Sequence, residues 1–189
     1  MKVAAVVLAA GASRRLGVLK QLVRLDGETL VERALHVCRE AECDPVVVVL
    51  GASADVVRKE CSFDDAIVVV NEEWAEGMGA SVRAGVAALA DDMDGCIVMT
   101  CDMPAVTAQH LRELVREGEV TASSYAKRRG VPAYFPRAMF AQLRKLTGDA
   151  GARDLLKQAQ AVELEGGELD IDTAADLRRA RELFSHPPA

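Results

Sequence analysis

A loop rich in small and basic residues follows the first hydrophobic segment of the chain. The segment from Val3 to Leu8 is apolar and long enough for one buried strand. It is followed by AAGASRRLGVLK, in which small residues let backbone amides approach a ligand closely, and Arg14, Arg15 and Lys20 supply positive charge. Amides combined with Arg and Lys suit a polyphosphate, because Arg offers a planar pair of donors and Lys a mobile point charge. The residue types therefore indicate binding of a phosphate-rich ligand.

Two common phosphate-binding motifs are excluded for this loop. A Walker A loop needs Lys directly after the glycine, whereas two residues separate Gly17 from Lys20. The dinucleotide motif needs three glycines at fixed spacing, and Gly11 is a single glycine. On residue types alone, an ordinary strand–loop junction with solvated basic residues is an equally good interpretation.

Two acidic segments could hold a metal ion. Asp102 follows the apolar run 95–100, which places it at the carboxyl edge of a sheet, where ligands bind in open α/β folds. A carboxylate there can hold Mg²⁺, although an Asp in a turn is an equally good interpretation. In LDIDTAADL, Asp170 and Asp172 would share one face of an extended segment. Asp172 could instead cap the last helix, on which Asp176 would be solvated.

The basic loop resembles the L-A-A-G-x-S-x-R-x-G-x-x-K loop of the small nucleotidyltransferases, which build nucleoside-diphosphate products from a nucleoside triphosphate. Within that superfamily the chain most closely resembles the molybdenum cofactor cytidylyltransferases. Leu16 stands where Met is often found. The resemblance implies that Arg15 and Lys20 neutralise the triphosphate. It also implies that the nucleotide is bound by the small residues at the start of the loop, namely Leu8, Ala9, Ala10, Gly11 and Ser13.

The two acidic segments match the same family. Asp102 lies in CDMP, which resembles the D-x-P element that holds the metal in these transferases. LDIDTAADL resembles the family's D-I-D-T-P-E-D-L, with two alanines replacing Pro and Glu. The resemblance implies a second metal carboxylate at Asp172 or Asp170, and we favour Asp172.

Three further segments carry the resemblance. NEEWAEGMGASVRAG resembles a stretch that lines the nucleobase pocket of the cytidylyltransferases, which implies that Gly79 and Ser81 lie near cytosine. LTGDAGARDLL resembles the L-x-G-D-x-G-A-R-x-L-L element, which implies that Asp149 and Arg153 bind the acceptor, with Arg153 as an anion clamp. The third segment resembles G-H-P-x-x-F, but Val131 replaces the common His.

The reaction implied by the resemblance is transfer of CMP from CTP to the terminal phosphate of molybdopterin. The products would be molybdopterin cytosine dinucleotide and pyrophosphate, with Mg²⁺ as cofactor and a molybdoenzyme or its chaperone as a further partner. Transfer of GMP, or transfer to another phosphorylated acceptor, stays open. A non-catalytic protein that binds or delivers the cofactor is a second alternative. The presence of Arg15, Lys20 and Asp102 argues against it, because a pure binder need not keep a metal carboxylate.

The order of apolar and amphipathic segments predicts the elements that position these residues. Short strands alternate with helices, which is typical of a doubly wound, mostly parallel sheet. The resemblance implies a Rossmann-like, nucleotide-diphospho-sugar transferase-like α/β fold. Residues 1–189 fit a single domain, with 185–189 as a frayed tail. The predicted strands after the first are 46–50, 66–70, 95–100, 121–125, 132–135 and 162–164. The predicted helices are 29–41, 53–60, 80–90, 107–117, 136–146, 152–160 and 173–184, opened in four cases by Ser53, Ser81, Thr107 and Thr173.

Composition limits the function further. The formal net charge of −6 argues against a nucleic-acid surface, which needs a basic face. Five cysteines without a C-x-x-C pair fit reduced thiols in a cytosolic protein rather than a zinc or redox site. The apolar start is too short to span a membrane and lacks the pattern of a secretory signal. We therefore expect a cytoplasmic protein without a membrane or nucleic-acid partner.

Overall fold

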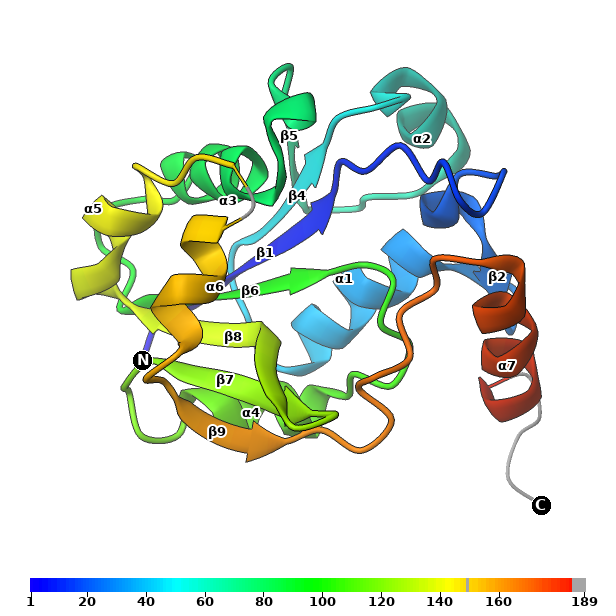
Figure 1. The fold of residues 1–189 in the computed structure, drawn as a ribbon. Coiled ribbons are helices and arrows are strands. Elements are labelled where there is room, and N and C mark those ends of the chain that lie inside the picture. The colour runs from blue at the N-terminus through cyan, green and yellow to red at the C-terminus, as the bar shows by residue number, and fades with distance from the viewer. Residues whose placement is uncertain (149, 185–189) are drawn as a thin grey trace.

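A seven-stranded sheet forms the centre of the molecule, with strand order β5-β4-β1-β6-β8-β7-β9 (Figure 1). The computed structural model describes residues 1–148 and 150–184. All neighbouring strands run parallel except β8, which is antiparallel to both β6 and β7. The strands are β1 (Val3–Ala9), β4 (Val46–Leu50), β5 (Ile67–Val70), β6 (Gly95–Thr100), β7 (Thr121–Tyr125), β8 (Arg128–Pro136) and β9 (Gln160–Glu163). A separate two-stranded hairpin is formed by β2 (Arg24–Leu25) and β3 (Glu28–Thr29). The sheet is mostly parallel, and the predicted fold class is confirmed.

Helices cover both faces of the sheet (Figure 1). They are α1 (Leu30–Glu40), α2 (Ala54–Glu60), α3 (Met78–Ala87), α4 (Ala108–Val115), α5 (Phe140–Leu143), α6 (Ala150–Leu156) and α7 (Ala174–Phe184). Three 3-10 turns complete the elements: η1 (Lys20–Leu22), η2 (Trp74–Glu76) and η3 (Arg137–Met139). Alternate residues of β1 face the two layers, so that Val7 packs with the side chains of α1 and α4, whereas Val6 packs with those of α3 and α5. Burial on both faces explains the continuous apolar sequence of this strand.

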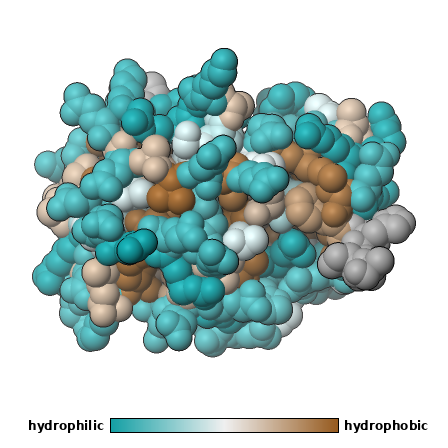
Figure 2. Space-filling view, turned by 90° about the horizontal axis from the view of Figure 1, so that it is seen from below, coloured by the Kyte–Doolittle hydropathy of each residue, from teal (hydrophilic) through white to brown (hydrophobic). Residues whose placement is uncertain are grey.

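Hydrophilic side chains cover most of the face drawn in Figure 2, where hydrophobic ones show between them in small patches. Within the described ranges, no helix combines the length and hydrophobicity needed to cross a membrane.

The close approach of α3 to the sheet depends on Gly85. A Cβ at this position would lie 2.3 Å from Cγ1 of Val6 and 2.9 Å from Cγ2 of Val49. We therefore expect Gly85→Ala to destabilise the protein by about 1–3 kcal/mol, although alanine is the better helix former, because the added methyl overpacks the interface. Urea unfolding measures the free energy of unfolding of this variant. Ala87→Gly, at an exposed position of the same helix, is the comparison. A stabilised Gly85→Ala variant would contradict the packing argument.

Several predicted element details are wrong. The apolar run 66–70 predicts a buried strand, but β5 is an edge strand, and Ile67 is 42% exposed. Ser53 does precede α2 at its N-cap position, as predicted, but it has a positive φ of 60° and its side chain makes no capping hydrogen bond. Ser81 does not open α3, because that helix begins at Met78 with Gly77 at its cap.

The second half of the chain contains shorter elements than the periodicity predicts. The expected helix 136–146 is the turn η3 followed by the single-turn α5, and the expected helix 152–160 is α6, which begins and ends earlier. The last strand is 160–163 rather than 162–164. Thr107 caps α4 as predicted by accepting a hydrogen bond from the amide of His110. At the start of α7, the hydroxyl of Thr173 accepts from the amide of Asp176, whose carboxylate accepts in return from the amide of Thr173.

Candidate active site

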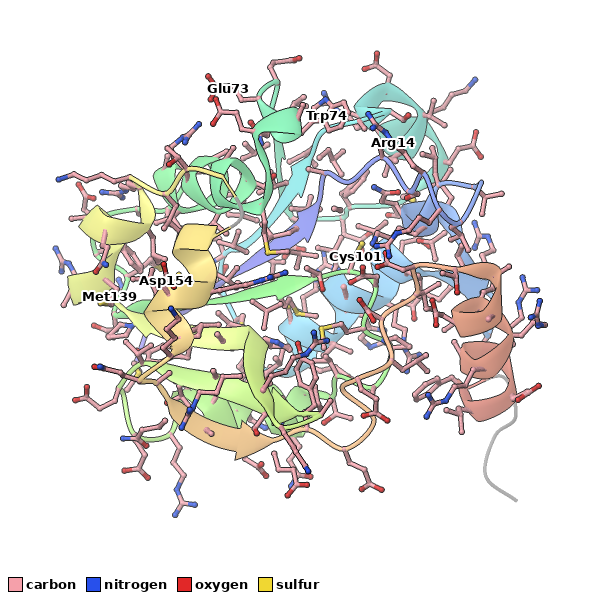
Figure 3. The ribbon with its side chains drawn as sticks, in the orientation of Figure 1. Arg14, Glu73, Trp74, Cys101, Met139 and Asp154 are labelled. Atoms are coloured by element: carbon pink, nitrogen blue, oxygen red, sulfur yellow. The ribbon has the colours of Figure 1, made fainter. Side chains whose placement is uncertain are left out.

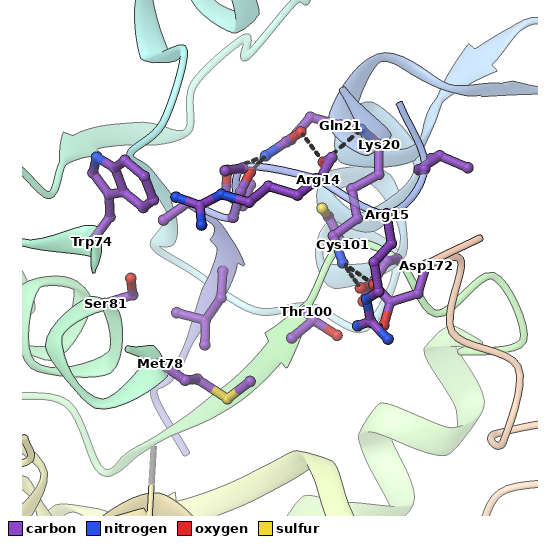
Figure 4. Close-up of a pocket in the computed structure, with 18 of the residues that line it drawn as sticks. Arg14, Arg15, Lys20, Gln21, Trp74, Met78, Ser81, Thr100, Cys101 and Asp172 are labelled. Carbon is purple, nitrogen blue, oxygen red and sulfur yellow. Dashed lines mark hydrogen bonds and ion pairs between the residues drawn. The ribbon is translucent and has the colours of Figure 1, made fainter. Parts of the chain in front are cut away.

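A cavity of about 480 Å³ opens where β1 and β6 end. Its lining consists of residues 8–16, Lys20, Gln21, Trp74, Ala75, Gly77, Met78, Ser81, residues 100–102 and Asp172. The basic loop that follows β1 thus forms one wall, and the start of α3 and the turn before it form the opposite wall (Figure 4). The carboxyl edge of a parallel sheet is where open α/β folds bind ligands, so this cavity is the candidate active site.

Lys20 lies between two carboxylates at one end of the cavity. Its Nζ is 2.5 Å from Oδ2 of Asp102 and 2.9 Å from Oδ1 of Asp172. Arg15 lies at 2.6 Å from the other oxygen of Asp172. Burial by itself would lower the pKa of Lys20, but the two carboxylates outweigh it and hold this pKa above its ordinary value. The ammonium group is therefore charged at any working pH of the protein.

The same carboxylates fit a divalent cation. Oδ1 of Asp102 is buried and has no hydrogen-bond partner among the described residues. Its other oxygen and Asp172 already face a cation, the ammonium of Lys20. The described residues contain no group of three or more His, Cys, Asp or Glu side chains that could hold a metal ion. Two carboxylates suit Mg²⁺, which usually completes its oxygen shell with water and substrate phosphates.

Asp172, and not Asp170, faces Lys20 and Arg15. Asp170 is exposed and does not line the cavity. The residue as a whole is exposed, but partial desolvation of its carboxyl group, together with the nearby negative charges of Asp102 and Asp172, raises the pKa of Asp170. The two carboxylates, which the sequence spacing could not distinguish, therefore differ in position: Asp172 lines the cavity and Asp170 does not.

Gln21 is a buried residue of the cavity wall that the sequence analysis did not select. Its side chain bonds to three residues of the basic loop, Ala9, Gly11 and Ser13. A polar residue directly after Lys20, with Leu19 and Leu22 on either side, was the available signal.

Trp74 and Ser81 form part of the opposite wall. Figure 3 shows Trp74 and Arg14 on the same side of the molecule, and both line the cavity. The hydroxyl of Ser81 accepts a hydrogen bond of 3.1 Å from the side-chain nitrogen Nδ2 of Asn71. Gly79 does not line the cavity, and its N–H donates to the carbonyl of Gly148. Of the two residues expected near the nucleobase, only Ser81 thus reaches the cavity.

Of the two residues expected to bind the acceptor, only Arg153 can be placed relative to the cavity. Arg153 is exposed on α6 and does not line the cavity, and Asp149 lies outside the described residues. Cys101 does line it, but burial raises the pKa of its thiol to about 12. The thiol is therefore protonated at neutral pH and unsuited to act as a nucleophile.

A mostly parallel α/β sheet with a small-residue loop, two basic side chains and two carboxylates at its carboxyl edge defines a protein that handles nucleotides. The chain belongs to the MobA-like NTP transferase domain family, whose model matches residues 5–163. It is therefore a protein of the nucleotidyltransferase class.

Three relatives indicate how diverse this family is. The chain is 34% identical to nicotine blue oxidoreductase of Paenarthrobacter nicotinovorans over 195 residues, covering 94% of this chain and 95% of that protein. It is 33% identical to purine catabolism protein PucB of Bacillus subtilis over 203 residues, covering 95% and 96%. It is 37% identical to a probable molybdenum cofactor guanylyltransferase of Opitutus terrae over 124 residues, covering 61% and 57%.

Solved structures share the fold over its whole length. The crystal structure of Rv0371c from Mycobacterium tuberculosis has a TM-score of 0.86 and 34% identity, covering 96% of this chain and 98% of that one. The manganese complex of the same protein has a TM-score of 0.79 and 31% identity, covering 96% and 99%.

Proposed function

We propose that the protein transfers CMP from CTP to the terminal phosphate of molybdopterin and releases pyrophosphate. The observation that carries this proposal is the cluster of Lys20, Arg15, Asp102 and Asp172 at one end of the cavity. It combines cations for a triphosphate with carboxylates for a divalent metal, and the small-residue loop lies beside both.

The reaction needs no nucleophile from the protein. An oxygen of the acceptor's terminal phosphate attacks the α-phosphorus of CTP, and the bond from this phosphorus to the oxygen bridging to the β-phosphate breaks. The electron pair leaves with pyrophosphate. Arg15 and Lys20 exchange their carboxylate partners for phosphate oxygens, hold the triphosphate and stabilise the charge that collects on pyrophosphate. Positioning of the two substrates supplies much of the remaining acceleration.

Asp102 and Asp172 are the residues that hold Mg²⁺ in this proposal. The buried, unpartnered oxygen of Asp102 suits a metal that takes its remaining ligands from the substrate and water. When bound, Mg²⁺ supplies Lewis-acid polarisation of the α-phosphate and neutralises its charge. The manganese complex of the related Rv0371c supports a divalent cation in this fold.

The choice of CTP and molybdopterin rests on the resemblance of the loop and of the segment around Ser81 to the cytidylyltransferases. The guanylyltransferase named among the relatives supports the link to molybdenum cofactor and keeps GMP transfer as the alternative. Arg153 remains our proposal for an anion clamp on the acceptor side, with Asp149 beside it in the chain. Delivery of the product to a molybdoenzyme or its chaperone is part of the same proposal.

Pyrophosphate release from each of the four nucleoside triphosphates, with Mg²⁺ and molybdopterin, tests the proposal. We expect release with CTP only. Release with GTP instead would assign the guanylyl reaction. No release from any nucleotide, despite measurable nucleotide binding, would contradict transfer to molybdopterin and would favour another acceptor or a protein that only binds or delivers the cofactor.

A further inference from the structure

Gln21 occupies a fully buried position under the basic loop. Its exposed fraction is 0%, although it carries a primary amide. The side-chain nitrogen donates two hydrogen bonds of 2.8 Å, one to the carbonyl of Ala9 and one to the carbonyl of Gly11. The side-chain oxygen faces the hydroxyl of Ser13 at 3.4 Å (Figure 4). A buried amide is costly unless its groups are paired, and here both of its ends bind the loop.

These bonds determine the direction of two backbone amides. The loop peptides are trans, since the cis bonds of the described chain precede Pro45 and Pro132. In a trans peptide, the carbonyl of one residue and the N–H of the next point in opposite directions. Because the carbonyls of Ala9 and Gly11 point toward Gln21, the N–H groups of Ala10 and Ala12 point away from it, and both of these residues line the cavity. Neither N–H donates a hydrogen bond to another described residue.

Gln21 also connects the loop to Lys20. The hydroxyl of Ser13 accepts a hydrogen bond of 3.0 Å from the backbone N–H of Lys20 and contacts the oxygen of Gln21. Ser13 has a positive φ of 52°, a conformation that a non-glycine residue adopts only when its surroundings favour it. One buried side chain thus fixes the two ends of the loop that encloses the phosphate-binding cations.

We propose that Gln21 is a positioning residue for nucleotide binding, which holds the amides of Ala10 and Ala12 toward the cavity so that they donate to acceptor atoms of the nucleotide. The inference rests on the proposed function only in requiring that a nucleoside triphosphate binds. The proposed role depends on the two N–H groups of the Gln21 side chain, because only a hydrogen-bond donor can bind the carbonyl groups of Ala9 and Gly11.

Two variants of similar size separate this role from simple packing. Gln21→Glu replaces the nitrogen that donates both hydrogen bonds with a second oxygen, which repels the carbonyls of Ala9 and Gly11. Gln21→Met keeps the length of the side chain and removes its polarity. Gln142→Glu, at an exposed position of α5, controls for the added negative charge.

The affinity for CTP with Mg²⁺ is measured by the fluorescence of Trp74, the single tryptophan, which lines the cavity. Mn²⁺ affinity without nucleotide is measured by electron paramagnetic resonance, and thermal unfolding reports on the fold. We expect Gln21→Glu to weaken CTP binding by about tenfold or more and Gln21→Met by a smaller factor, as for one to two lost hydrogen bonds. Mn²⁺ affinity should stay within about twofold of wild type, since the hydrogen bonds of the Gln21 side chain go to Ala9, Gly11 and Ser13 and not to Asp102 or Asp172.

CTP affinity within about twofold of wild type in a folded variant would overturn the proposal. A parallel loss of CTP and Mn²⁺ binding would overturn it as well, because this is the result of a general loss of structure. If Gln21→Glu does not fold, Gln21→Met decides. If the wild-type protein binds a triphosphate but forms no dinucleotide product, the proposed function is contradicted and the role of Gln21 is not. The same titrations of the Gln21 variants with that triphosphate then test the role of Gln21.

Discussion

Replacing Asp102 by asparagine should lower the rate of CMP transfer by about a thousandfold or more while the protein stays folded. Asp102 is only 7% exposed, one of its oxygens is unpartnered, and the other binds Lys20. An amide of the same shape carries no charge for a divalent cation and offers it a single oxygen. Pyrophosphate release at saturating CTP and Mg²⁺ measures the loss, and circular dichroism with thermal unfolding checks the fold.

Three matched variants give this experiment its controls. Asp55→Asn removes an exposed carboxylate of α2 that does not line the cavity, and it should leave the rate unchanged. Asp172→Asn should reduce the rate by a factor similar to that of Asp102→Asn, whereas Asp170→Asn should have a small effect. Retention of more than about a tenth of the wild-type rate in Asp102→Asn would be incompatible with its role as a metal ligand. A loss confined to Asp170→Asn would move the second ligand to that residue.

The parallel part of the sheet could be predicted from the sequence because local patterns determine it. The bounds of β4 and β6 agree with the predicted segments, since both strands are continuous apolar runs limited by Pro, Gly or Asp. Because the predicted end of β6 is correct, Asp102 follows this strand as expected. The apolar run of β5 was equally clear, but its position at the edge depends on strand order, which no local pattern contains.

The composition of the site could be predicted only in part. Lys20 and Asp172 are 152 positions apart in the chain, and their contact depends on the path of the segment before α7 across the end of the sheet. Spacing alone could not choose between Asp170 and Asp172 for this reason. Gly79 was expected near the nucleobase, but its N–H is bound by the carbonyl of Gly148, a tertiary contact without a sequence pattern. Gln21 was missed because its role depends on the folded path of the loop around it.

Replacing Lys20 by methionine should have two opposite effects. Transfer should fall by about 10²–10³-fold, because the triphosphate loses a cation that stabilises the departing pyrophosphate. Binding of Mn²⁺ in the absence of nucleotide should become tighter, by about tenfold, because the ammonium of Lys20 competes with a divalent cation for the same two carboxylates, those of Asp102 and Asp172. Steady-state kinetics measures the first effect, and titration of Mn²⁺ followed by electron paramagnetic resonance measures the second.

The two effects together distinguish competition from ordinary damage to the site. A variant that merely distorts the cavity loses transfer and binds metal more weakly, whereas removal of a competing cation leaves both carboxylates available to the metal. Lys145→Met, at an exposed position after α5, should change neither quantity. Weaker Mn²⁺ binding in a folded Lys20→Met variant would mean that Lys20 helps to hold the carboxylates in place. Tighter binding would mean that, in the wild type, Lys20 leaves the carboxylates for the triphosphate as the metal arrives, so that each ligand promotes binding of the other.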